Sequence, residues 1–559
     1  MSKIYNNFDL MHIIYCFKGF TPRNRDELIE AINFYCVKKK KAIKKYGKMS
    51  EWNTIYITDM SYLFSKSRLC KIIKNTRIEK DEDKTDSFFE IYSDSNSDSD
   101  SDSDSYSEYV DSDDDDHLDF IFNAFICNWD TSNVKNMEGM FKNATFFNQD
   151  IGKWHVSKVT NMESMFEGTF KFNQDIGEWD VSKVKNMDHM FYNSVFNQDI
   201  GEWNTSNVLN MSSMFNNAKY FNQDIGKWDV SKVTNMESMF SDATKFNQDI
   251  GKWDVSKVTN MEYMFYKAQN FNQSIGKWDV SKVTNMEGMF YNATFFNKDI
   301  GKWDVSKVTN MQSMFCDSDF FRDSRFNQDI GKWDVSNVTN MSFMFSGSRF
   351  KQDIGKWDVS NVTNMSSMFR YTKYFNQPIG EWDVSNVTDM ERMFFGSIFN
   401  QDIGKWDVSN VTDMSFMFDD AKYFNQNIEK WDVSNVTNMS SMFRYAKYFN
   451  QPIGEWDVSN VTDMYQMFFR AEEFNQDITL WNVSKVKNMK KMFCCVRKFN
   501  QPIGFWKLNP DVELDSMLYY AISFNQDLIN WKLSDYKILI KKDKNLGKNF
   551  EDYAKRIIF

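Results

Sequence analysis

The chain has 559 residues, 42% of them hydrophobic, and a formal net charge of −11 that is unevenly distributed. Residues 79–119 carry 18 acidic and two basic side chains, a net of −16, so the other residues sum to +5. Because the rest of the chain is close to neutral, we expect no nucleic-acid partner. Because no run of about 18 apolar residues occurs, we expect no membrane span.

Residues 1–48 are predicted to form an N-terminal helical cap. Thr21 before Pro22 is typical of a helix start, with a capping side chain followed by proline at the first helical position. The segment "RDELIEAINFYC" is amphipathic, and "KKKKAIKKYG" predicts a second helix that ends at Gly47. A cap is needed because the first coil of a stacked array would otherwise expose its core.

Residues 49–67 are predicted to be the first repeat, and residues 68–121 an acidic, Ser/Asp-rich disordered insertion. Ser and Asp nearly alternate from Ser93 to Ser105, a composition that cannot form a core. Serine beside acidic residues suits acidophilic kinases, and the alternative is a plain solvated segment. The candidate phosphorylation sites are Ser97, Ser99, Ser101 and Ser103.

Residues 122–534 are predicted to form the main repeat array. The string "FNQDIGKWDVSKVTNM" occurs at 221–236 and again, letter for letter, at 246–261. All 18 tryptophans occupy one position of the repeat, at steps of 24 or 25 residues apart from one step of 30, which an insertion at 316–325 explains, and the long step across residues 68–121. A fixed period of this length indicates a solenoid.

Each repeat is predicted to contain one short strand and one short helix. Ile, Trp and Val in "IGKWDV" have the spacing of a leucine-rich-repeat strand. Met, Met, Phe and Ala in "VTNMESMF" and the following residues have helical spacing, and Thr160–Glu163 reads as a capping box. The predicted fold is therefore an α/β, leucine-rich-repeat-like solenoid of about 18 repeats, closed by a C-terminal cap at 535–559. The alternative is a solenoid similar to a parallel β-helix.

The string "FNQDIGKWDVSKVTNMESMF" resembles the bacterial surface protein repeat of BspA-like proteins, which also occurs in mycoplasma lipoproteins and giant DNA viruses. The resemblance extends from about Thr21 to Ser534. It implies a leucine-rich-repeat-like solenoid and, in bacteria, surface adhesion or binding. The N-terminus is a poor signal peptide, so we expect an intracellular protein, in a host cytoplasm or a virion if viral, rather than a secreted one.

Charged residues on either side of Trp form the candidate binding face. If Trp points inward, the Lys before it and the Asp after it point outward and form two rows of opposite charge. The rows are either a recognition face or a solvated, self-compensating surface. The candidates are Lys227, Asp229, Lys252, Asp254, Lys277, Asp279, Lys302 and Asp304.

Two other recurring positions have a structural and a functional interpretation. The Asn of "FNQ" recurs in almost every repeat, Lys351 being an exception, and a ladder that satisfies backbone groups is favoured over a binding role. Aromatic residues after the repeat Phe, such as Tyr266, Tyr291 and Phe395, either pack on the next coil or contact a partner.

Catalytic and metal chemistry have no visible constellation in the sequence. Its four histidines form no zinc or catalytic pattern, and its seven cysteines include no CxxC pair. We therefore expect no enzymatic activity, no cofactor and no bound metal, and reduced thiols. The leading hypothesis is a monomeric, non-catalytic scaffold that binds an unknown protein or glycan. The alternative is a purely structural component of a particle or surface layer.

Overall fold

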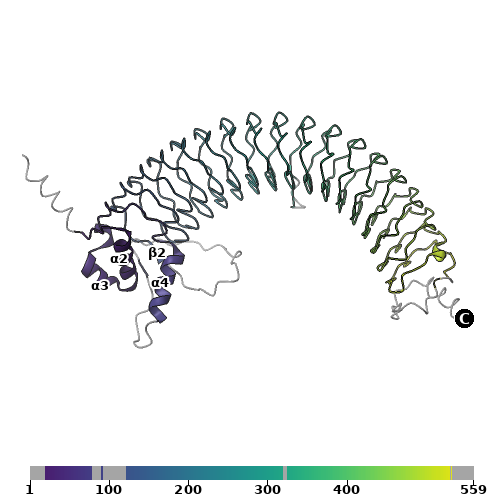
Figure 1. Cartoon of the computed structure of the whole chain (residues 1–559), viewed down its shortest axis with the longest axis horizontal. Helices are drawn as coiled ribbons and strands as arrows, with labels where there is room; N and C mark the ends of the chain where they lie inside the picture. The colour runs from purple at the N-terminus through teal and green to yellow at the C-terminus, as the bar shows by residue number, and fades with distance from the viewer. Residues whose placement is uncertain (1–18, 79–89, 92–120, 319–323, 529–530, 532–559) are drawn as a thin grey trace, which may run out of the picture. The chain divides into compact units, whose positions relative to one another are not determined.

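The computed structural model describes residues 19–78, 90–91, 121–318, 324–528 and 531. The chain divides into two compact units, Met1–Asp249 and Ile250–Phe559, a boundary that the repeat pattern does not predict. Within each compact unit, successive repeats form coils that stack side by side (Figure 1). The chain is thus a repeat solenoid, as its period indicates.

Two helices pack together ahead of the first coil. Helix α2, Arg25–Val37, begins after Asn24, whose side chain accepts a hydrogen bond from the Glu27 backbone amide at 2.9 Å. The predicted start at Thr21 is therefore wrong, because Asn24 is the residue that caps the first turn. Helix α3, Lys39–Tyr46, ends at Gly47, which adopts a positive φ of 77°. A single 3₁₀ turn, η1 at Met49–Glu51, leads into the first coil.

The segment that was predicted to be a disordered insertion begins as a helix. Helix α4, Lys66–Ile78, packs against α2, so residues 68–78 are ordered and the prediction is wrong there. Strand β1, Glu90–Ile91, pairs in parallel with β2, Ile121–Phe122. The rest of the insertion, with all four candidate phosphorylation sites, lies outside the described residues, and its predicted disorder stays a prediction.

The first coil stacks directly on the coil that follows the insertion. Asp59 forms a parallel bridge with Asn136, and the rings of Trp52 and Trp129 are stacked with centroids 6.3 Å apart. This confirms that the repeat continues in register across the insertion. A long loop is compatible with such stacking because loop-closure entropy grows only slowly with length.

The interior of each coil is built from side chains that stack on their own copies. Trp278 is 4% exposed and its ring lies 6.5 Å from that of Trp303, with the planes 1° apart. Its indole N–H donates to the Ile250 carbonyl of the preceding coil at 3.2 Å. The inward orientation of Trp is confirmed, but the spacing exceeds the roughly 5 Å expected for paired strands.

The segment that was predicted to be a helix in each repeat forms tandem tight turns, and that prediction is wrong. The Met165 amide bonds to the Met162 carbonyl at 3.2 Å, whereas the Ser164 amide bonds to Asp188 of the next coil at 2.8 Å. Ser164 and Gly168 both have positive φ, 53° and 66°, at the third position of a four-residue turn, as in type II turns. Alternate amides thus bond to the neighbouring coil, which an α-helix would not allow.

The predicted strand at "IGKWDV" is also wrong. The Trp278 amide bonds to the Ile275 carbonyl at 3.1 Å, so this stretch reverses direction instead of extending. Parallel pairing occurs instead at single bridges between the Asn residues of "TNM", such as Asn285 with Asn310. The predicted capping box is absent as well: Glu163 accepts from the Asn186 side chain of the next coil at 2.8 Å.

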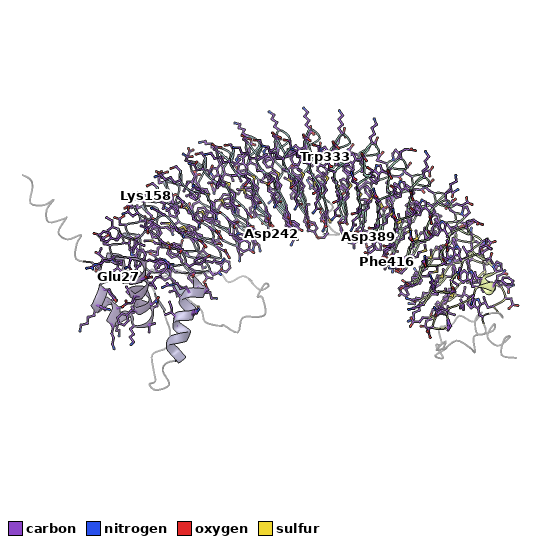
Figure 2. The ribbon with its side chains drawn as sticks, in the orientation of Figure 1. Glu27, Lys158, Asp242, Trp333, Asp389 and Phe416 are labelled. Atoms are coloured by element: carbon purple, nitrogen blue, oxygen red, sulfur yellow. The ribbon has the colours of Figure 1, made fainter. Side chains whose placement is uncertain are left out.

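We call the surface at these turns the ladder face. In the coil of Trp154 it comprises residues 161–168, and in each of the remaining coils it comprises the equivalent residues. The Asn residues of "FNQ" are not part of it. In the second compact unit, Asp389 and Phe416 lie on this face, toward the edge opposite Trp333 (Figure 2). The described part of the second compact unit ends with a 3₁₀ turn, η2 at Ile503–Phe505, and the coil of Trp531.

Candidate functional site

The predicted rows of Lys and Asp are exposed on either side of the buried Trp, as all eight candidate residues show. Asp304 accepts a hydrogen bond from the Ser306 amide at 3.1 Å, so its carboxylate holds the following turn. Hydrogen bonds from this serine lower the pKa of Asp304, and those from Ser281 do the same for Asp279. Lys227 forms an ion pair with Glu202. The rows thus have a structural use, and their role in binding stays a prediction.

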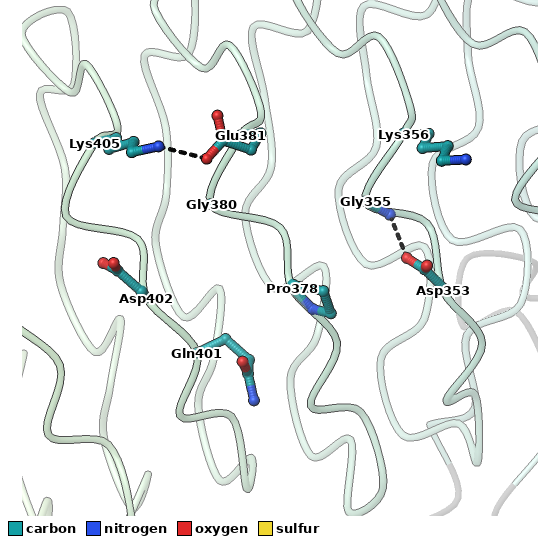
Figure 3. A pocket seen from close by; sticks show the side chains of 9 residues that line it. All are labelled: Asp353, Gly355, Lys356, Pro378, Gly380, Glu381, Gln401, Asp402 and Lys405. Carbon is teal, nitrogen blue, oxygen red and sulfur yellow. Dashed lines mark hydrogen bonds and ion pairs between the residues drawn. The ribbon is translucent and has the colours of Figure 1, made fainter.

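A shallow hollow of about 380 Å³ lies beside the Lys and Asp rows in the second compact unit (Figure 3). Pro378 stands where adjacent coils carry Asp353 and Asp402, and all three residues line the hollow. Glu381 and Lys405 pair across it at 2.6 Å with both side chains at least 70% exposed. Because this ion pair is exposed to solvent, we assign the hollow no chemistry.

The Asn residues of "FNQ" form a structural ladder, which confirms the favoured interpretation. Asn400 accepts from the Asn425 amide at 3.0 Å and from the Gln426 side chain at 2.9 Å. Each coil thus supplies the acceptor for the next. Lys351 accepts nothing through its side chain, although its own amide bonds to Asn327 at 3.0 Å.

Predicted aromatic contacts lie on the ladder face, where they are half-buried. Tyr266 and Tyr291 stack with centroids 4.8 Å apart, and Tyr371 meets Phe395 edge-on at 4.8 Å. They therefore pack on the neighbouring coil, as favoured, and still leave part of each ring in solvent. Such rings can contribute to binding without first being ordered.

A large ring at a left-handed position is accommodated by glycine in the next coil. A Cβ atom added at Gly288 would lie 2.3 Å from the Tyr263 ring, and one at Gly139 would lie 2.4 Å from Tyr62. Tyr263 also donates a hydrogen bond to Glu287, and burial raises its pKa. The ladder face thus tolerates large side chains where its neighbours make room.

In the second compact unit, arginine and aromatic side chains of the ladder face form a cluster. Arg392 lies over the Phe416 ring at 4.4 Å, and Arg470 lies 5.5 Å from Tyr445 and 5.6 Å from Phe469. Guanidinium groups held over rings gain cation–π energy and stay partly open to solvent. The cluster comprises Arg370, Tyr371, Arg392, Phe395, Phe416, Arg444, Tyr445, Phe469 and Arg470.

Asp419 is buried beneath the cluster and anchors it. Its Oδ2 pairs with Arg444 at 2.6 Å, and its side chain is 1% exposed. Among the described residues its Oδ1 finds no hydrogen-bond donor. Burial, only partly offset by the arginine, raises the pKa of Asp419 to about 6. Removing this carboxylate would therefore release Arg444 from its position over Phe416 and Tyr445.

The sequence pattern of aromatic residues after the repeat Phe also includes Tyr371, Tyr445 and Phe469, but it missed Phe416, the arginines and Asp419. The signal was present: the residue after the repeat Phe changes from coil to coil, through Arg370, Phe395, Asp419, Arg444 and Phe469, while the buried letters hardly change. Arg470, one position further, belongs to a second variable column. Arg392 and Phe416 belong to a third variable column, two positions before the repeat Phe. Variation at these columns marks a surface whose side chains the fold does not prescribe.

Other chemistry is sparse in the part of the chain that the structure describes. Six cysteines there are free thiols, and burial raises the pKa of Cys36 and Cys316 to about 12. Within that part, no three His, Cys, Asp or Glu side chains are arranged to hold a metal ion. None of its helices combines the length and apolar content needed to cross a membrane.

Among the comparisons with known proteins, the family model supports a repeat protein, because it matches the chain in seven segments. One solved structure, described as "Crystal structure of TLR13-ssRNA13 complex", is similar over 73% of this chain and 65% of that chain, at 8% identity and a TM-score of 0.18. No curated protein matches. A family model matches most of the chain in overlapping segments, at residues 34–100, 117–225, 174–275, 245–325, 298–398, 378–478 and 450–541. The chain therefore belongs to the family described as "Mycoplasma protein of unknown function, DUF285".

Proposed function

We propose that this chain is a non-catalytic repeat scaffold that binds a protein partner through the ladder face of its second compact unit. The observation that carries the proposal is the separation of two kinds of position. Interior positions and the turn at "IGKWDVS" repeat almost unchanged, whereas variable positions gather on the ladder face. A purely structural stack needs no such separation, because every coil could carry the same surface.

The composition of the arginine–aromatic cluster favours a protein partner. Arg and Tyr are enriched at the energetic centres of protein interfaces, where half-buried rings lose little entropy on binding. The cluster is not a simple cationic patch, since Glu391 pairs with Arg392 and Asp419 pairs with Arg444. Mixed charge of this kind gives specificity for one surface instead of general affinity for polyanions.

Site-specific photocrosslinking tests the proposal. A photoreactive phenylalanine analogue at Phe469 should capture a partner in the native cell. The same analogue at Lys405, on the exposed Lys row, is the matched control and should capture none. Arg470→Ala should reduce the capture at Phe469, since its guanidinium lies over that ring.

The outcomes separate the proposed function from its alternative. If both positions crosslink only to other copies of this chain, side-by-side packing is the function and the binding scaffold is wrong. Capture of the same partners at Phe469 and Lys405 would remove the special role of the ladder face. Glycan-modified material bound equally by the Arg470→Ala variant would favour a glycan over a protein.

A further inference from the structure

Helix α3 breaks the electrostatic rules of a stable helix. Residues 38–48 contain seven lysines and no acidic residue. Its first turn has Lys39, Lys40 and Lys41 where the helix dipole favours negative charge, and Lys38 makes no side-chain capping bond. Lys40 and Lys44, four residues apart on one helix, repel each other.

Little in the described structure offsets these charges. Lys38, Lys40, Lys41, Lys44 and Lys48 are exposed. Lys45 pairs with Glu30 at 3.8 Å, and it lies 4.6 Å from the Tyr46 ring. Among the residues that the structure describes, the other lysines of this stretch have no acidic side chain within 4.0 Å. A local rule broken without compensation is typical of a functional site.

We propose that the lysine-rich surface of α3 and its flanking residues, Lys38, Lys40, Lys41, Lys44 and Lys48, docks the chain's own acidic segment, residues 93–116. The chain itself contains a segment of the required charge. Its residues 93–116, "SDSNSDSDSDSDSYSEYVDSDDDD", contain no basic residue and lie outside the described structure. They follow shortly after α4, which packs on α2, as α3 does. Such a segment supplies the carboxylates that the dipole and the lysine pairs lack.

The lysines of α3 also differ from the arginines of the ladder face in how their charges are paired. On the ladder face, Arg392 and Arg444 already have acidic partners within the chain. On α3, the lysines are exposed on flexible stems, which suits a repetitive polyanion better than a shaped surface. Failure of this inference would therefore leave the proposed function untouched, and the reverse also holds.

Fluorescence anisotropy with a labelled synthetic peptide of residues 93–116 tests the docking. The peptide is titrated into the full-length chain and into a full-length variant in which every acidic residue of 93–116 is changed to its amide. We expect saturable binding to the amide variant, weakening about tenfold between about 50 and about 200 mM salt because exposed charges are screened. Adding Lys40→Gln, Lys41→Gln and Lys44→Gln to that variant should weaken binding at least about tenfold.

A matched control removes the same number of charges elsewhere. Lys257→Gln, Lys282→Gln and Lys307→Gln, three exposed lysines outside the candidate binding face, should leave the peptide affinity of the amide variant unchanged. Equal affinity of both triple variants would overturn the proposal. Circular dichroism keeps the test valid, because the α3 substitutions remove repulsion and should not reduce thermal stability.

The remaining outcomes test whether the chain's own segment is the occupant. Binding to the amide variant but not to the intact chain means that the chain's own segment already occupies α3. Equal binding to the intact chain would overturn the proposal, because the chain's own segment would then leave the lysines of α3 open. Tighter, lysine-dependent binding of a DNA duplex or of phosphatidylserine vesicles than of the peptide would show a different class of partner and overturn the proposal.

Discussion

The interior and the ladder face of each coil follow opposite rules. Interior residues such as Phe166 and Phe191, whose rings stack with centroids 5.6 Å apart, pack on identical neighbours and repeat with little change. On the ladder face, the backbone makes the bonds between coils, so its side chains vary from Arg370 to Phe395 to Asp419. A residue type must be the same in successive coils where its side chain stacks on its copy. It can vary where backbone hydrogen bonds hold the coils together.

The largest effect should come from breaking the interior. Trp278→Ala removes a 4% exposed ring and its hydrogen bond to Ile250, and should cost about 3–5 kcal/mol. Chemical denaturation measures the loss, and hydrogen exchange should place it in the adjacent coils. Trp531→Ala, near the end of the array, should cost less, and equal losses would contradict a stack of nearest neighbours.

A second test concerns Asp419, an ionisable group inside the ladder face. Its pKa is raised from 3.8 to about 6, so its contribution to stability is fully present below pH about 4 and lost as pH rises through about 6. Asp419→Asn should remove this loss, a relative gain of about 2–3 kcal/mol between pH 4 and 7. Urea unfolding of both proteins across this range measures the difference.

An exposed aspartate outside the ladder face gives the opposite sign. Hydrogen bonds from Ser385 lower the pKa of Asp383, so its contribution is present above the unfolded pKa and lost as pH falls. Asp383→Asn should therefore flatten the acid side of the curve and leave the interval near pH 6 unchanged. Identical pH profiles for the two variants would contradict the special burial of Asp419.

The repeat period and the buried positions were predictable from the sequence because each produces a regular pattern of apolar residues. Tryptophan recurs at one position, and its burial follows from its size and its regular spacing. The predicted helix failed because Met-x-x-Met-Phe spacing suits both a helix and a pair of four-residue turns. The turns need left-handed residues, and Ser164 or His189 there gives no sign of it in the sequence.

A weaker signal for the turns was present in the second left-handed column. It contains Asn143, Gly168, Asn193, Asn217 and Asp242, residue types that adopt positive φ most readily. Read down the column instead of along the chain, these residues indicate turns. The cluster around Asp419 could be foreseen only in part, because the pairing of Arg444 with a carboxylate 25 residues away depends on how the coils stack.

A third test examines a position of the ladder face where the neighbouring coil restricts the size of the side chain. Gly288→Ala places a Cβ at 2.3 Å from the Tyr263 ring, at a φ of 55°, and should cost about 1–3 kcal/mol. Thermal unfolding measures it. Tyr263→Ala combined with Gly288→Ala should recover most of the loss, because the ring is then gone. A double variant no better than Gly288→Ala would assign the cost to backbone strain alone.

The smallest expected effect comes from completing the Asn ladder at its natural gap. Lys351 lies in the "FNQ" column where Asn327 and Asn376 precede and follow it, and the Asn376 side chain accepts from the Asn400 amide at 2.8 Å. In Lys351→Asn, the new carboxamide should accept from the Asn376 amide. Because that amide is near solvent, the gain should be only about 0.5–1 kcal/mol.

The Asn400→Ala variant is the counterpart, since it removes an existing acceptor and should destabilise by about 1–2 kcal/mol. Differential scanning calorimetry of both should show opposite shifts in Tm. If Lys351→Asn also lowered Tm, the ladder would depend on more than the acceptor at this position, and the lysine would have a packing role of its own.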